Sequence, residues 1–187
     1  MSEDGDSQGG YWDSVTAWRP PADRIESVAR WRTPELDLHG CCLRTIPDRV
    51  WTMTHLKELH LYNNQLTAVP EAIASLTELT WLSLSGNELR TLPDSIGSLT
   101  RLTRLDVQDN QLTEIPGSLA RLGGLTTLFL SGNRIRVLPA WLAELPGLVT
   151  VHADGNPLTH VPLQLTQRYG IRRSGTETDD DPFGASA

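Results

Sequence analysis

A 23-residue period runs through most of this chain. The segment LTWLSLSGNELRTLPDSIGSLTR begins at Leu79, and similar segments begin at Thr33, Leu56, Leu102, Leu125 and Leu148. The copies follow one another without insertion or deletion. A fixed period in this range is typical of solenoid proteins, in which each repeat is one turn of a coil and is stabilised by its neighbours.

Four columns of the repeat define its register. The sixth position is apolar in every copy, from Leu38 to Ala153, and so is the eighteenth, from Val50 to Leu165. The ninth position is asparagine in five copies and Cys41 in the first, and the fifteenth is proline in all six. The apolar columns predict one continuous core that forms as turns stack, because a single turn cannot bury its own leucines.

These columns also predict the shape of each turn. The central Leu-x-Leu alternates with period two and predicts a short strand, so six strands would form one parallel sheet. The asparagine amide can donate to and accept from backbone groups of the bend that follows. The proline suits the first position of a helical turn on the opposite side. We therefore expect an α/β solenoid of six repeats, with the parallel sheet on the concave face and short helical or 3-10 turns on the convex face.

The N-terminal flank divides into two parts. Residues 1–13 are acidic and rich in glycine and serine, and we expect them to be disordered. Residues 14–32 contain a helical pattern for which Asp23 is a candidate N-cap. We expect Ile25, Val28 and Trp31 of this helix to pack on the first repeat as a cap, because the terminal repeats of a solenoid need one. A helix that binds a partner is the alternative.

The repeat domain is expected to span residues 33–171. The sixth repeat departs from the pattern at Arg168, where the other five copies have an apolar residue, so the core should end there. Tyr169 and Ile171 are the residues that we expect to close it. Residues 172–187 are charged and poor in apolar residues, which predicts a disordered acidic tail.

Charge and cysteine content restrict the classes of partner and compartment. The net charge is −7, and the sequence has no cluster of lysine and arginine, so we expect neither nucleic acid nor an anionic membrane as a partner. We find no pattern of a signal peptide and no apolar run of the length that a membrane helix needs. Cys41 and Cys42 are adjacent, an arrangement that rarely bridges, and these features together favour the cytoplasm.

The outward positions of the strands are the expected binding face. The third, fifth, seventh, eighth and tenth positions of each repeat should face away from the core. Three large aromatic residues fall among them, with charged and polar neighbours, and aromatic residues of this kind are enriched at interface hot spots. We predict that this face binds a partner protein through Glu58, His60, Tyr62, Trp81, Ser83, Arg104, Asp106, Gln108, Phe129, Arg134 and His152.

Signs of catalysis and of cofactor binding are missing from the sequence. No motif frames any serine as a nucleophile, and neither a phosphate-binding loop nor a dinucleotide fingerprint is present. His39 and His60, with Asp37 and Cys42, offer ligand types that zinc accepts, but no Cys-x-x-Cys or His-x-x-x-His spacing supports a site. We therefore expect no enzyme activity, no cofactor and no metal.

The 23-residue repeat with its Leu-Pro step resembles the leucine-rich repeats of intracellular Ras-group proteins. The resemblance covers residues 33–168 and implies the solenoid fold, a cytoplasmic location and the binding of proteins on the concave face, small GTPases among them. In relatives that are enzymes, the catalytic site lies in an additional domain attached to the repeats. We expect no such domain in this chain, because its length leaves no room for one. The expected function is that of a non-catalytic binding module or adaptor. The alternative is a structural subunit that self-associates through the ends or the convex face of the solenoid.

Overall fold

Six parallel strands form a single open sheet in the computed structural model, which describes residues 20–174. The strands are β1 (Glu35–Asp37), β2 (Glu58–His60), β3 (Trp81–Ser83), β4 (Arg104–Asp106), β5 (Thr127–Phe129) and β6 (Thr150–His152). Each pairs with the next in the chain, and residues 23 apart lie side by side, as in Glu58↔Trp81 and Trp81↔Arg104. The predicted α/β solenoid with a parallel sheet is therefore confirmed.

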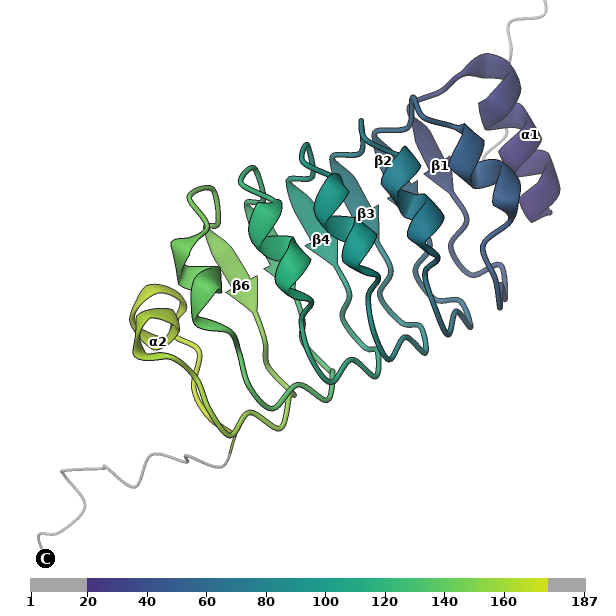
Figure 1. The fold of residues 1–187 in the computed structure, drawn as a ribbon. Helices are drawn as coiled ribbons and strands as arrows, with labels where there is room; N and C mark the ends of the chain where they lie inside the picture. Colours follow the sequence, from purple (N-terminus) through teal and green to yellow (C-terminus); the bar gives the residue numbers. More distant parts are fainter. Residues whose placement is uncertain (1–19, 175–187) are drawn as a thin grey trace, which may run out of the picture.

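A row of short 3-10 helices covers the opposite side of the coil (Figure 1). They are η1 (Asp48–Thr52), η2 (Glu71–Ser75), η3 (Asp94–Ser98), η4 (Gly117–Arg121) and η5 (Ala140–Glu144). The repeat proline precedes each of them as the N-cap residue, rather than standing at the first helical position as predicted. Its carbonyl accepts the first 3-10 hydrogen bond, as Pro93 does from the Ile96 N–H at 3.1 Å.

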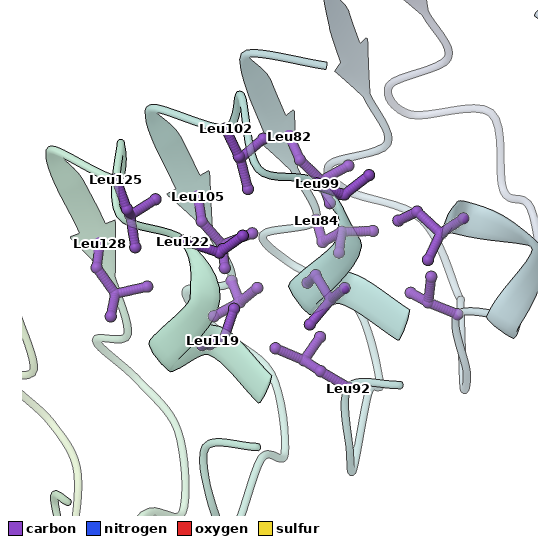
Figure 2. Close-up of a cluster of buried hydrophobic side chains, with 14 of the residues drawn as sticks. Leu82, Leu84, Leu92, Leu99, Leu102, Leu105, Leu119, Leu122, Leu125 and Leu128 are labelled. Carbon is purple, nitrogen blue, oxygen red and sulfur yellow. The ribbon is translucent and has the colours of Figure 1, made fainter. Parts of the chain in front are cut away.

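The core lies between the sheet and the 3-10 helices. Leu82, Leu105 and Leu128, the central residues of β3 to β5, are fully buried. Figure 2 shows Leu82 beside Leu99 and Leu105 beside Leu122, so leucines from the two sides of a turn meet inside it, and successive turns stack these pairs in a row. This arrangement buries every apolar column of the repeat in one continuous cluster, as the periodicity predicts.

The asparagine column ties each turn to the one before it. The Asn87 side-chain nitrogen donates to the carbonyl oxygens of Leu84 in its own turn, at 2.9 Å, and of Leu61 in the preceding turn, at 3.0 Å. Its oxygen accepts from the Leu66 N–H at 3.0 Å. Asn64, Asn110, Asn133 and Asn156 repeat this pattern. The amides therefore satisfy buried backbone groups of two turns at once.

The eighth column has a backbone conformation that the sequence analysis does not anticipate. All six residues have positive φ, between 51° and 69°. They are Gly40, Asn63, Gly86, Asp109, Gly132 and Gly155. Glycine enters this left-handed region without steric cost, and asparagine and aspartate tolerate it better than other residues do. The column consists only of these three residue types, which is the signal that would have revealed the turn.

Helices α1 (Pro21–Trp31) and α2 (Leu163–Tyr169) cover the two ends of the solenoid (Figure 1). Ile25 and Val28 of α1 join the core as expected, but Trp31 is 69% exposed and does not pack on the first repeat. The predicted cap residue Asp23 is also wrong: the N-cap is Pro20, and no side chain caps the helix. Asp23 lies one turn inside, where its N–H bonds to the Pro20 carbonyl.

At the C-terminal end of the solenoid, side chains donate hydrogen bonds to backbone carbonyls of the last repeats. Arg168, although exposed, donates to the carbonyl oxygens of Ala143 and Leu148 at 2.7 and 2.9 Å, and Tyr169 donates to that of Leu148. Ile171 is buried against the core, as expected. The expectations for residues 1–13 and for most of residues 172–187 lie outside the described residues.

Candidate functional site

The outer face of the sheet presents three side-chain columns. The first and third residues of each strand point away from the core, while the middle leucine or valine is buried. The seventh position of each repeat follows the strand and continues this face. Because the strands are parallel and in register, residues of one column are neighbours across the sheet. We call this surface the sheet face.

Ring contacts connect the first three turns on the sheet face. The His39 ring stacks on Tyr62 with centroids 4.8 Å apart and planes only 5° from parallel. Tyr62 meets the His60 ring edge-on at 6.4 Å, and His60 meets Trp81 edge-on at 4.6 Å. These side chains come from the first, second and third repeats, so their contacts cross two strand boundaries.

The contacts continue to the last strand. The Arg104 guanidinium lies 4.7 Å from the centre of the Trp81 ring and 5.7 Å from that of Phe129. Phe129 stacks on His152 at 5.0 Å with planes 4° apart. Together His39, Tyr62, His60, Trp81, Arg104, Phe129 and His152 make an unbroken series of stacking and cation–π contacts over all six repeats. We call this series the aromatic row.

Carboxylates surround the N-terminal half of the aromatic row. A shallow hollow of ≈ 500 Å³ lies there, over β1 to β4, and Glu35, Asp37, Glu58 and Asp106 are among the residues that line it. Hence this half of the sheet face is acidic.

The Asp37 carboxyl is held by His39. Its Oδ1 accepts from the His39 N–H at 3.0 Å and lies 2.7 Å from the ring Nδ1. Burial alone would raise the pKa of Asp37, but these hydrogen bonds and the nearby histidine charges outweigh burial and hold that pKa below its ordinary value. The carboxylate therefore stays charged and fixes the His39 ring against Tyr62.

Most of the predicted binding residues lie on the sheet face, but with less exposure than expected. His60, a member of the aromatic row, and Ser83 are buried, at 7% and 4% exposure, and Tyr62, Trp81 and Phe129 are each half-buried. Gln108 folds back so that its side chain and backbone nitrogens both donate to Asp106. Arg134 is exposed on the bend after β5 and takes no part in the ring contacts of the described residues.

Three residues on β1 and after it were missing from the predicted set. Glu35 and Asp37 line the hollow, and His39 begins the aromatic row. The signal was present, because the register places Glu35 beside Glu58 and Asp37 beside His60. The strand pairs themselves follow from the 23-residue step.

Among the described residues, two carboxylates and a histidine lie close enough together to hold a metal ion. Glu35, Glu58 and His60 each place a ligand atom within 4.8 Å of the others. This group differs from the combination considered from the sequence, since Cys42 and His39 are not part of it. Cys41 and Cys42 are both free thiols.

Models of known protein families match most of the chain. A leucine-rich repeat region model matches residues 14–113, and a second leucine-rich repeat model matches residues 95–158. The chain belongs to the leucine-rich repeat family. Domains of this family generally mediate protein–protein interactions. A search of the curated proteins finds no match. Over residues 20–174, no helix has the length and apolar character that crossing a bilayer requires.

Solved leucine-rich repeat structures are similar to the chain. The repeat domain of the type III effector XopL has a TM-score of 0.71 and 29% identity, and the match covers 79% of this chain and 53% of that one. A leucine-rich repeat protein of Leptospira interrogans has a TM-score of 0.63 and 27% identity, and the match covers 74% of this chain and 41% of that one. The plant peptide hormone receptor RGFR1, in complex with RGF2, has a TM-score of 0.55 and 30% identity, and the match covers 60% of this chain and 19% of that one. The chain thus spans about half or less of the length of these relatives.

Proposed function

We propose that this chain is a non-catalytic module that binds a partner protein through the sheet face. The aromatic row carries the proposal. It places three large aromatic side chains and an arginine, the residue types enriched at hot spots, on a preformed surface with charged neighbours. The rings are already held by one another, which lowers the ordering cost of association.

The size of the sheet face agrees with a protein or peptide partner. Six strands spaced ~4.8 Å apart span roughly 24 Å, and five residues along each strand give ~16 Å, so the sheet face covers roughly 400 Å², about half of the ~800 Å² per partner of a standard interface. We infer that a partner also contacts the loops at the strand ends or binds as an extended segment along the aromatic row. A relative in the same fold, RGFR1, was solved with RGF2 bound.

We also propose a finer class and a location. The 23-residue step and the proline in all six repeats resemble the intracellular Ras-group repeats, and no cysteine-clamped cap is present in the part of the chain that the structure describes. This resemblance favours the cytoplasm and includes small GTPases among the partners to be tested.

The test is a comparison of partners captured from host lysate. The wild-type chain is compared with a Tyr62→Ala/Trp81→Ala/Phe129→Ala variant, after circular dichroism has shown that both are folded. A Val149→Ala/Leu163→Ala variant is the matched control, because both side chains are large, apolar and exposed but lie away from the aromatic row. We expect the first variant alone to lose the partner. Equal capture by all three proteins would exclude the sheet face as the binding surface.

The second candidate is a structural subunit that self-associates through its ends. The observation that favours it is the exposure of large apolar side chains there: Trp31 on α1 is 69% exposed and Leu163 on α2 is 65% exposed. Sedimentation velocity over a range of concentrations measures this directly. A mass that rises with concentration, and that falls back to the monomer in a Trp31→Ser/Leu163→Ser variant, would favour assembly over the adaptor.

A further inference from the structure

We propose that Glu35, Glu58 and His60 form a binding site for a divalent transition-metal ion of the Zn²⁺ type on the N-terminal half of the sheet face. The site shares His60 with the aromatic row, but binding of the ion does not require the partner protein. Two observations carry it: the spacing of the three ligand atoms, and the burial of a histidine whose ring nitrogen points at two carboxylates.

The register of the sheet assembles the three ligands. Glu35 on β1 and Glu58 on β2 are paired residues of adjacent parallel strands, so their side chains leave the sheet next to each other. His60 lies two residues beyond Glu58 on the same strand and therefore on the same face. Neighbouring turns of a rigid solenoid thus hold all three, without a contribution from a loop.

The spacing fits a shared cation better than it fits hydrogen bonds. The His60 Nε2 lies 3.5 Å from a Glu58 carboxylate oxygen and 3.7 Å from one of Glu35. Both distances exceed the roughly 2.7–3.2 Å of an N–H···O hydrogen bond. A tetrahedral Zn²⁺ with ligands at about 2.0–2.1 Å separates them from one another by about 3.3 Å. The two histidine–carboxylate distances need to shorten by only a few tenths of an ångström, and the two glutamate oxygens, which lie within 4.8 Å of each other, can approach through rotation of their exposed side chains.

His60 is oriented in advance of any ligand. Its residue exposure is 7%, and the Trp81 ring packs against it edge-on at 4.6 Å. The ring forms no hydrogen bond with any other described residue, and its contacts with Glu35 and Glu58 are longer than hydrogen bonds. The ring nitrogen Nε2 faces the two carboxylates and no other polar group of the described residues, so it already points toward the position that an ion would occupy.

The surroundings favour a cation. Four carboxylates line the hollow, on Glu35, Asp37, Glu58 and Asp106, and its lining includes no lysine or arginine. Asp37 is the register neighbour of His60, and its carboxylate adds negative charge beside the site. One imidazole with two carboxylates suits borderline ions such as Zn²⁺ rather than Mg²⁺ or Ca²⁺, which take oxygen ligands. The fourth coordination position faces the hollow, where water or a carboxylate of a partner would complete it.

The experiment is a titration of the metal-free full chain with Zn²⁺ by calorimetry, and with Co²⁺ by visible absorption, which reports tetrahedral coordination. Glu35→Gln and Glu58→Gln remove one ligand charge each and keep the size of the side chain. Asp106→Asn is the matched control, because it removes the same charge from the same hollow but is not a ligand. A Cys41→Ser/Cys42→Ser variant tests for binding at the thiols.

We expect one Zn²⁺ per chain, a loss of affinity of at least about 10-fold in Glu35→Gln and in Glu58→Gln, and a change of less than about 3-fold in the two controls. Absence of binding at about 100 µM Zn²⁺ would overturn the proposal and leave His60, Glu35 and Glu58 as a polar cluster of the sheet face. Equal affinity of the wild type and both glutamine variants would do the same. Loss of affinity only in the cysteine variant would assign the ion to the thiols.

Discussion

The two ends of the asparagine column, where asparagine is absent, show what the asparagines do. Each asparagine bonds to its own turn and to the turn before it, so its role requires a preceding turn. Cys41 begins the column, where no repeat precedes, and its thiol only reaches the His39 carbonyl. At the other end no asparagine follows Asn156, and the Ser174 hydroxyl accepts from the Leu158 N–H instead. Ser174 thus stands where a seventh asparagine would.

The loss of stability on replacing a residue of the asparagine column should therefore depend on whether another turn precedes it. Replacing Asn110 by alanine removes an acceptor for the Leu89 N–H and donors for the carbonyls of Leu84 and Val107 in the middle of the solenoid. We expect the free energy of unfolding to fall by ~1–3 kcal/mol, because buried backbone groups lose their partners. Cys41→Ala is the control in the same column and should cost much less. Urea denaturation of both variants measures the difference, and equal costs would contradict the account.

The Asp37–His39 pair predicts a pH-dependent contribution to stability. The folded-state pKa of Asp37 lies below its unfolded value of about 3.9, so the charged carboxylate stabilises the fold above that pH and ceases to do so as the pH falls through the folded-state pKa. Asp37→Asn keeps an acceptor for the His39 N–H but removes the charge. The melting temperature of the wild type should exceed that of the variant above about pH 5, and the gap should close below about pH 4. A gap that does not change with pH would show that the charge is unimportant.

At the residue scale, the sequence predicted the columns but not every bond within them. The sequence predicts that asparagine bonds to backbone groups of the bend in its own turn, but its side-chain oxygen accepts from an N–H of the preceding turn. That bond depends on the distance between stacked turns, which the sequence does not give. The left-handed eighth column was missed although its glycine, asparagine and aspartate residues were visible. Trp31 is expected to pack on the first repeat with the rest of the capping helix, but it is the last residue of α1, directly before Arg32 ends the helix in a left-handed conformation, and it is exposed.

Two adjacent 3-10 helices, η3 and η4, approach each other closely at Gly97. A Cβ added at Gly97 in η3 would lie 2.5 Å from the carbonyl oxygen of Ser118 in η4. Atoms of a backbone cannot move aside as the end of a side chain can. By contrast, a Cβ at Gly117, the first residue of η4, would meet nothing within 4 Å. The other 3-10 helices carry an aspartate, a glutamate or an alanine at the position of Gly117.

Two alanine substitutions should therefore act with opposite signs. Gly97→Ala should destabilise the protein by ~1–3 kcal/mol, because the overlap with η4 forces the two elements apart. Gly117→Ala should stabilise it by ~0.4–1 kcal/mol, because alanine restricts the unfolded chain at a site with free space. Thermal unfolding monitored by circular dichroism compares them. Stabilisation by Gly97→Ala would mean that the η3–η4 contact is looser than described.

Elements and their order were predictable for a simple physical reason. The strict 23-residue step fixes both the strand pairing and the side of the sheet on which a residue lies, so Tyr62, Trp81 and Phe129 were placed on one face. The row that they form was not predictable, because ring contacts such as His39 on Tyr62 depend on side-chain rotamers. The same holds for the three ligands, whose distances decide between an ion pair and a metal site.

Over residues 20–174 the molecule is a linear array in which the main contacts join adjacent turns. Strands pair in chain order from β1 to β6, α1 packs on β1 and α2 packs on η5 (Figure 1). In such an array stability is a sum of repeat and interface contributions, so a defect at one end weakens that end first. The caps then act locally, and each one protects the repeats beside it.

A mirror pair of substitutions tests this property of the whole molecule. Ile25 of α1 is 3% exposed and Ile171 after α2 is 8% exposed, so each anchors one cap in the core. Truncation of a buried isoleucine to alanine costs ~2–5 kcal/mol, and here we expect that loss to fall mainly on the adjacent turns. Amide hydrogen exchange followed by mass spectrometry should quicken in β1 and β2 for Ile25→Ala, and in β5 and β6 for Ile171→Ala, with little change in β3 and β4. If either substitution quickens exchange equally along residues 20–174, the six turns unfold as one unit and the caps stabilise all of them together.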